Sequence, residues 1–159
     1  MTRRGLFTLP RRAFLRAAGT CALALPTGMW GARAGVTADG IAQPNLPTAE
    51  AFIERAFAMR QQAIDSGDQP YGAVVVLDGL IVGQSQSLVV INGDPTAHAE
   101  MAAIRDATRR LGRRALTGAT LYSSSNPCAM CEAAAYWARI DQMVFGRALA
   151  NGGRPHLCA

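Results

Sequence analysis

A run of small and branched apolar residues near the middle of the chain restricts the fold most. Residues 72–77 read Gly-Ala-Val-Val-Val-Leu and predict a strand that is buried on both faces. Asp78-Gly79 follows at once and predicts a two-residue hairpin turn, with the return strand at Leu80–Gln84. Such a hairpin needs further layers of structure to cover its two faces.

Helices and strands alternate around this hairpin. Thr48 is the expected N-cap of a helix whose apolar residues recur at helical spacing up to Ser66-Gly67. After the hairpin the pattern predicts a polar loop up to Pro95, a helix at His98–Leu111, a strand at Thr120–Ser123, a helix at about Cys128–Arg139, and a strand at Gln142–Phe145. The order predicts an α/β fold in which helices cover a mixed sheet.

The basic character of the chain is confined to its start. The formal net charge is +5, all cations are arginines, and six of the sixteen arginines lie in the first 34 residues, which contain no acid. The remaining residues hold ten arginines and eleven acids, a formal net charge of −1. A nucleic-acid partner for the main domain is therefore not indicated.

The first 34 residues have the three zones of an export signal. Five arginines, Arg3, Arg4, Arg11, Arg12 and Arg16, come before a modestly apolar stretch at 17–30, and Ala32-Arg33-Ala34 suits a signal peptidase. The segment Arg11-Arg12-Ala13-Phe14-Leu15 resembles the twin-arginine motif, whose machinery carries folded proteins. We expect export to the periplasm or beyond, without stable membrane insertion, and a flexible linker at 35–47. The alternative is an amphipathic or disordered arm with chance arginine pairs.

Candidate metal ligands stand at the starts of two predicted helices. His98 and Glu100 open one helix, and Cys128 and Cys131 follow Pro127 at the start of the next. Thiolate and imidazole are ligands that Zn²⁺ prefers, and cysteines three residues apart on a helix face one direction. Three ligands leave one tetrahedral position open for water, beside which Glu100 is suited to act as general acid and base.

Each of these residues has a simpler interpretation when it is taken alone. A lone histidine is commonly a surface residue, a Cys-x-x-Cys pair can be a redox pair, and a glutamate at a helix start can serve only the dipole. A closed structural site needs a fourth ligand, for which His156 and Cys158 are the candidates beyond the export segment. The joint pattern favours a catalytic zinc site held by His98, Cys128 and Cys131.

Several segments resemble the cytidine and deoxycytidylate deaminase superfamily. The zinc motifs are Thr96-Ala97-His98-Ala99-Glu100 and Pro127-Cys128-Ala129-Met130-Cys131. Pro70-Tyr71-Gly72-Ala73-Val74 and Ala135-Tyr136-Trp137-Ala138-Arg139 are most similar to the bacterial guanine and nucleoside deaminases, with tRNA adenosine deaminases as relatives. The resemblance covers about residues 48–146 and implies a three-layer α/β/α sandwich and a dimer or higher oligomer.

The resemblance also implies an activity and a set of substrate contacts. It implies a zinc-dependent hydrolytic deaminase that releases ammonia from a free nucleobase or nucleoside. The implied substrate contacts are the backbone N–H of Ala99, the side chain of Ser87, which stands where the family usually has asparagine, and Trp137 as a pocket wall. For Trp137, core packing is an equally good interpretation.

Two other functions stay open. The first is a tRNA or nucleic-acid adenosine deaminase. The phosphates of its nucleic-acid substrate could contact the cluster of Arg109, Arg110, Arg113 and Arg114. The near-neutral charge after residue 34 and the export signal argue against it, and a solvated helix end is the simpler interpretation of the cluster. The second is a catalytically impaired, zinc-stabilised protein that resembles deaminases.

The C-terminal segment departs from the family pattern. Residues 147–159 contain no acid, whereas the relatives continue through a fifth strand and a helix, and guanine deaminases use a late acidic residue for the purine. We therefore expect a C-terminally shortened domain with an irregular tail and an exposed sheet edge, which a homodimer would cover. We also expect weak or absent guanine deamination.

Overall fold

The computed structural model describes residues 40–157. The predicted export segment 1–34, residues 35–39 of the predicted linker and the last two residues of the chain lie outside the described part. Export by the twin-arginine machinery therefore stays a prediction. Among the described residues, no helix has the length and apolarity that a membrane span requires.

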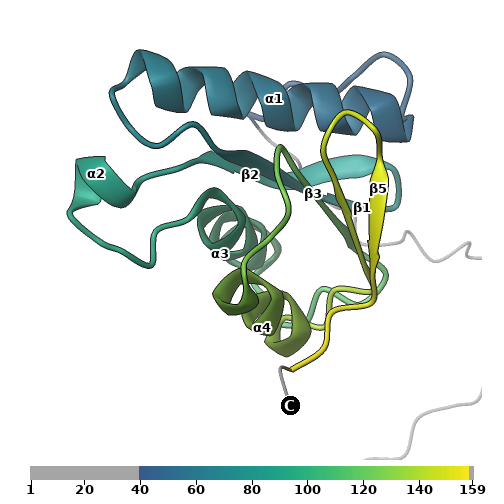
Figure 1. The fold of residues 1–159 in the computed structure, drawn as a ribbon. Coiled ribbons are helices and arrows are strands. Elements are labelled where there is room, and N and C mark those ends of the chain that lie inside the picture. Colours follow the sequence, from purple (N-terminus) through teal and green to yellow (C-terminus); the bar gives the residue numbers. More distant parts are fainter. Residues whose placement is uncertain (1–39, 158–159) are drawn as a thin grey trace, which may run out of the picture. The chain divides into compact units, whose positions relative to one another are not determined.

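A five-stranded mixed sheet lies between two layers of helices (Figure 1). The strands are β1 (Gly72–Leu77), β2 (Leu80–Gln86), β3 (Thr120–Ser123), β4 (Gln142–Phe145) and β5 (Ala150–Gly153). Their spatial order is β2-β1-β3-β4-β5, with β3 and β4 parallel and every other neighbouring pair antiparallel. Helix α1 (Ala49–Asp65) covers one face, and α3 (Ala99–Leu111) and α4 (Ala129–Trp137) cover the other. This confirms the predicted three-layer α/β/α sandwich.

Strand β1 lies at the centre of the core because both of its faces are buried. Val74 and Val76 belong to the apolar cluster beneath α1, together with Phe52. Ala73 and Val75 alternate with them and belong to the cluster beneath α3 and α4. A strand between two helical layers accepts apolar side chains at every position, which explains the continuous apolar run in the sequence.

Local signals predict where most elements begin and end. Helix α1 begins after Thr48, whose Oγ1 accepts a hydrogen bond from the N–H of Ala51 at 3.2 Å. The turn between β1 and β2 uses Asp78 and Gly79 with φ of 51° and 78°, as a two-residue hairpin turn requires. The starts of α3 and α4 lie within a residue of their predicted positions.

Gly83 in β2 lies so close to α3 that a Cβ atom there would meet the helix backbone. It would lie 2.5 Å from the N atom of Ala107 and 2.6 Å from the O atom of Ala103. We expect Gly83→Ala to lower the free energy of unfolding by about 1–3 kcal/mol, because α3 must move away from the sheet. Urea unfolding measures this, with Ser85→Ala in the same strand as the control for a smaller change. An unchanged urea midpoint for Gly83→Ala would show that the helix shifts at no cost.

The C-terminal segment contains a strand, so the prediction of an irregular tail at 147–159 is wrong. Strand β5 pairs with β4, with Asn151 opposite Val144 and Ala150 opposite Phe145. The chain itself therefore covers the edge of β4 that the sequence predicts to be exposed. Residues 151–153 are Asn-Gly-Gly and have low strand propensity, so pairing with the available edge determines this strand. The homodimer stays a prediction.

Part of the predicted flexible linker at 35–47 is docked onto the domain. Ile41 is only 6% exposed and belongs to the cluster beneath α1. The side-chain amide of Gln43 accepts from the N–H of Ile81 at 2.8 Å and donates to the carbonyl of Ile81 at 2.9 Å. Gln43 thus satisfies backbone groups of the edge strand β2, which fixes this segment beside the sheet.

Candidate metal centre

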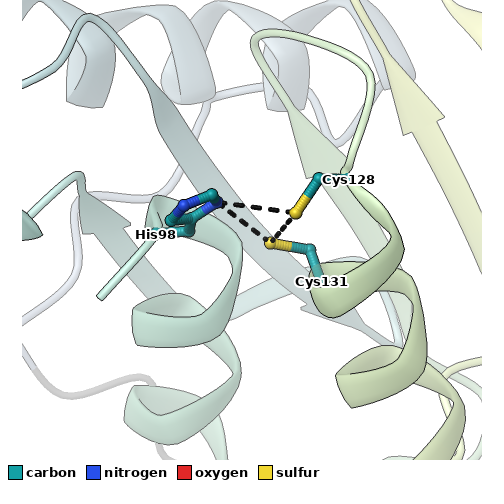
Figure 2. Close-up of side chains that lie close together, drawn as sticks. All are labelled: His98, Cys128 and Cys131. Carbon is teal, nitrogen blue, oxygen red and sulfur yellow. Dashed lines mark hydrogen bonds between the residues drawn. The ribbon is translucent and has the colours of Figure 1, made fainter. Parts of the chain in front are cut away.

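Three potential zinc ligands come together from two helix starts (Figure 2). His98 directly precedes α3, Cys128 directly precedes α4, and Cys131 lies in the first turn of α4. The two helices pack against each other on one face of the sheet, so their N-terminal ends bring the three side chains to one place. One donor atom of each residue lies within 4.8 Å of the others.

The spacing of the three donor atoms fits a tetrahedral zinc ion. The Sγ atoms of Cys128 and Cys131 are 3.7 Å apart, and Nδ1 of His98 lies 3.7 Å and 3.6 Å from them, respectively. Zinc bonds of about 2.3 Å to sulfur and about 2.0–2.1 Å to nitrogen imply separations of roughly 3.8 Å between sulfurs and roughly 3.6 Å between nitrogen and sulfur. The donors therefore suit Zn²⁺ as they stand. Within residues 40–157 no other His, Cys, Asp or Glu joins the group.

Both ligand cysteines are free thiols in the structure, Cys128 exposed and Cys131 buried. Cys131 is fully buried. Burial, and secondly the carboxylate of Glu100, raise the pKa of its thiol above the ordinary value. Zinc binds thiolate, so the ion must displace this proton. The positive end of the α4 dipole favours the thiolate form of Cys131. A bound cation stabilises two neighbouring thiolates more strongly than the dipole does.

Glu100 lies beside His98, Cys128 and Cys131, which we call the metal group, but is not one of its ligands. Glu100 is only 4% exposed, and Sγ of Cys131 donates a hydrogen bond to its Oε2 at 3.6 Å. Burial raises the pKa of the Glu100 carboxyl, so this group takes up a proton more readily than an exposed glutamate. A buried carboxyl of this kind is suited to general acid–base chemistry next to a metal.

The predicted substrate contacts lie in three different settings. Ala99 is the first residue of α3, next to His98, and its N–H has no acceptor within the helix. Ser87 follows β2, is fully buried, and its N–H donates to the carbonyl of Tyr71 at 2.9 Å. Trp137 ends α4, about 9 Å beyond Cys131 along the helix axis, and is 71% exposed. The structure therefore places Trp137 away from the metal group, because the direction of α4 carries it to the opposite end.

Asp68 has a structural role that the sequence does not indicate. This residue is 8% exposed, and its Oδ2 accepts hydrogen bonds of 2.9 Å from the N–H groups of both Val90 and Ile91. It thereby holds helix α2 (Val89–Asn92), which stands where the sequence predicts a polar loop. The loop after α2 ends at His98, so Asp68 helps to position the ligand segment. No sequence signal links an acid after Gly67 to residues so far along the chain.

Of the two sequence candidates for a fourth ligand, His156 does not lie with the three ligands. Nδ1 of His156 lies 2.6 Å from Oε1 of Glu132 in α4, and the N–H of His156 donates to the same oxygen at 3.3 Å. This pair ties the segment after β5 to α4. Cys158 lies outside the described residues.

Comparisons with known proteins agree with this geometry. The family model for the cytidine and deoxycytidylate deaminase zinc-binding region matches residues 46–147. The guanine deaminase of Bacillus subtilis is 45% identical over 57% of this chain and 58% of its own length. A tRNA-specific adenosine deaminase of Aquifex aeolicus is 40% identical over 60% of this chain and 64% of its own length.

The fold is similar to that of a solved relative. The crystal structure of guanine deaminase from Bacillus subtilis matches with a TM-score of 0.59 and 43% identity, over 62% of this chain and 63% of that one. The chain thus spans about six tenths of the length of the relatives named above.

Proposed function

Because the chain belongs to the cytidine and deoxycytidylate deaminase zinc-binding family, we propose that it is a zinc-dependent hydrolytic deaminase. The reaction replaces the amino group of a cyclic amidine by a carbonyl oxygen and releases ammonia. The substrate we propose is a free nucleobase or nucleoside. The observation that carries the proposal is the tetrahedral spacing of His98, Cys128 and Cys131 next to the buried carboxyl of Glu100.

The residues of this site divide the chemistry between binding and proton transfer. His98, Cys128 and Cys131 would hold the zinc ion, which would polarise a water molecule and lower the pKa of that water toward neutrality. Oε2 of Glu100 accepts a proton from the water and delivers it to the ring nitrogen, while the water oxygen bonds to the amidine carbon. Glu100 then moves the second water proton to the amino group. The carbon–nitrogen bond breaks, a carbonyl forms and ammonia leaves. The N–H of Ala99 is available to donate to a substrate carbonyl.

The alternative substrate is an adenosine in tRNA, which the relative from Aquifex aeolicus supports. The charge of the domain supports the small substrate instead, because residues 35–159 carry a formal net charge of −1. Two arginines of the cluster also form ion pairs within the domain. Arg109 and Arg110 lie 2.7 Å and 2.8 Å from the carboxylate oxygens of Asp106. They therefore hold the end of α3 rather than present free charge to phosphates.

Ammonia release by the zinc-loaded protein tests the proposed substrate class. The panel contains guanine, adenine, cytosine, their nucleosides and tRNA. We expect ammonia from at least one free base or nucleoside, released at least about 100-fold more slowly by Glu100→Ala. Release from tRNA alone would favour the editing function. No release from any substrate by a fully zinc-loaded protein would favour the third interpretation, a zinc-stabilised protein without this activity.

A further inference from the structure

A hollow at the far end of α4 plays no part in the proposed reaction. It has a volume of about 960 Å³ and is lined by Arg114, Thr117, Tyr136, Trp137, Arg139 and Arg154, among others. Helices α3 and α4, which lie side by side in Figure 1, begin at the metal group. The residues that line the hollow come from the end of α4, from the segment that follows α3 and from the segment after β5. The hollow and the metal group are therefore separate places on the domain.

Two aromatic side chains stand on this hollow with much of their surface in solvent. Trp137 is 71% exposed and Tyr136 is 42% exposed. Their rings meet edge to face, with centroids 5.4 Å apart and planes at 84°. This contact holds the two rings at a right angle to each other and leaves most of the indole uncovered. An indole in this setting is a surface on which a planar ring can stack.

Three guanidinium groups line the same hollow, with a single carboxylate among them. Nη2 of Arg154 lies 3.6 Å from Oδ1 of Asp141, whose Oδ2 accepts the N–H of Gly118 at 2.9 Å. Arg114 and Arg139 form no ion pair with any residue of the described range 40–157. The hollow thus offers two unpaired planar cations beside an exposed indole, although the domain as a whole is close to neutral.

We infer that this hollow binds a nucleotide unit, with its base stacked on Trp137 and its phosphate held by Arg114 and Arg139. A guanidinium group donates two parallel hydrogen bonds to phosphate oxygens, and the face of an aromatic ring can stack on any base. The inference goes beyond the proposed deaminase function, because no residue of the metal group lines the hollow. The nucleotide unit can be a free nucleotide or part of a single strand.

The charge distinguishes a nucleotide from a second copy of the chain. Two copies meeting through this hollow would bring their arginines together, and like charges oppose such contact. A second explanation for the arginines is that the negative C-terminal ends of the helix dipoles attract cations. This attraction explains neither the exposed indole of Trp137 nor the position of Arg154, which comes from the segment after β5.

Fluorescence of Trp137 tests the inference directly. The chain has two tryptophans, so Trp30→Phe leaves Trp137 as the only reporter. The ligands are inosine 5′-monophosphate, inosine, inorganic phosphate and a single-stranded oligouridylate, none of which carries an amino group that a deaminase could remove. We expect the monophosphate to change the fluorescence with a dissociation constant below about 1 mM, and inosine or phosphate alone to bind at least about tenfold more weakly.

Two variants separate specific binding from other effects. Arg114→Gln with Arg139→Gln should weaken binding of the monophosphate at least about tenfold, whereas Arg105→Gln on the exposed side of α3 should not. Calorimetry with Trp137→Ala should show the same loss, and circular dichroism should show an unchanged fold. Tighter binding of the oligouridylate than of the monophosphate would identify a strand as the source, and equal or weaker binding a free nucleotide.

Three results would overturn the inference. They are no binding of either the monophosphate or the oligouridylate, equal binding of inosine and its monophosphate, and unchanged affinity in folded arginine or Trp137 variants.

Discussion

Replacing Cys131 by alanine is expected to abolish zinc binding and to destabilise the domain. Cys131 is fully buried, and its sulfur lies within 3.7 Å of the other two donor atoms. Without it, only His98 and Cys128 remain as ligands, and two ligands do not hold a tetrahedral ion in place. Metal binding contributes to folding free energy where the ligands come from separate elements, as here from α3 and α4. We expect His98→Ala and Cys128→Ala to behave alike.

Metal analysis and thermal unfolding measure both effects. We expect about one zinc per wild-type chain, close to none in the variants, and a chelator-sensitive melting temperature only in the wild type. Cys158→Ser is the matched control, and it should keep its zinc. Full occupancy in Cys131→Ala would contradict the three-ligand site. Loss of zinc in Cys158→Ser would mean that Cys158 closes the site as a fourth ligand.

The second large effect is expected at Glu100. Glu100→Gln keeps the size of the side chain but removes the carboxylate that accepts the water proton. We expect zinc content and melting temperature close to those of the wild type and a loss of about 100-fold or more in kcat for ammonia release. The prediction rests on the proposed deaminase function and uses whichever substrate the panel identifies.

Glu50→Gln is the matched control for this variant. Glu50 is also an acid in the first turn of a helix, but it lies in α1 and is exposed. It should keep the wild-type rate. An active Glu100→Gln enzyme would show that another group transfers the proton. A Glu100→Gln protein that cannot hold zinc would show that Glu100 supports the metal instead.

Elements and residues that depend on near neighbours can be predicted from the amino-acid sequence. The apolar run at 72–77 and the Asp78-Gly79 turn are short-range signals, and the structure has both where the sequence predicts them. Cys128 and Cys131 come together because a helical turn separates them by a fixed distance, and Pro127 marks where that helix can begin. The metal group is recognisable from the sequence because its motifs lie at two such helix starts.

Features that depend on residues far apart in the sequence arise only when the chain folds. Strand β5 exists because β4 offers an unpaired edge to residues 151–153, whose own preference is not for a strand. Gln43 and Asp68 bond backbone groups far along the chain, and no local pattern records such contacts. Trp137 lies at the hollow rather than at the metal because the direction of α4 separates its two ends. Periodicity identifies a helix, but packing on the sheet decides where each of its ends points.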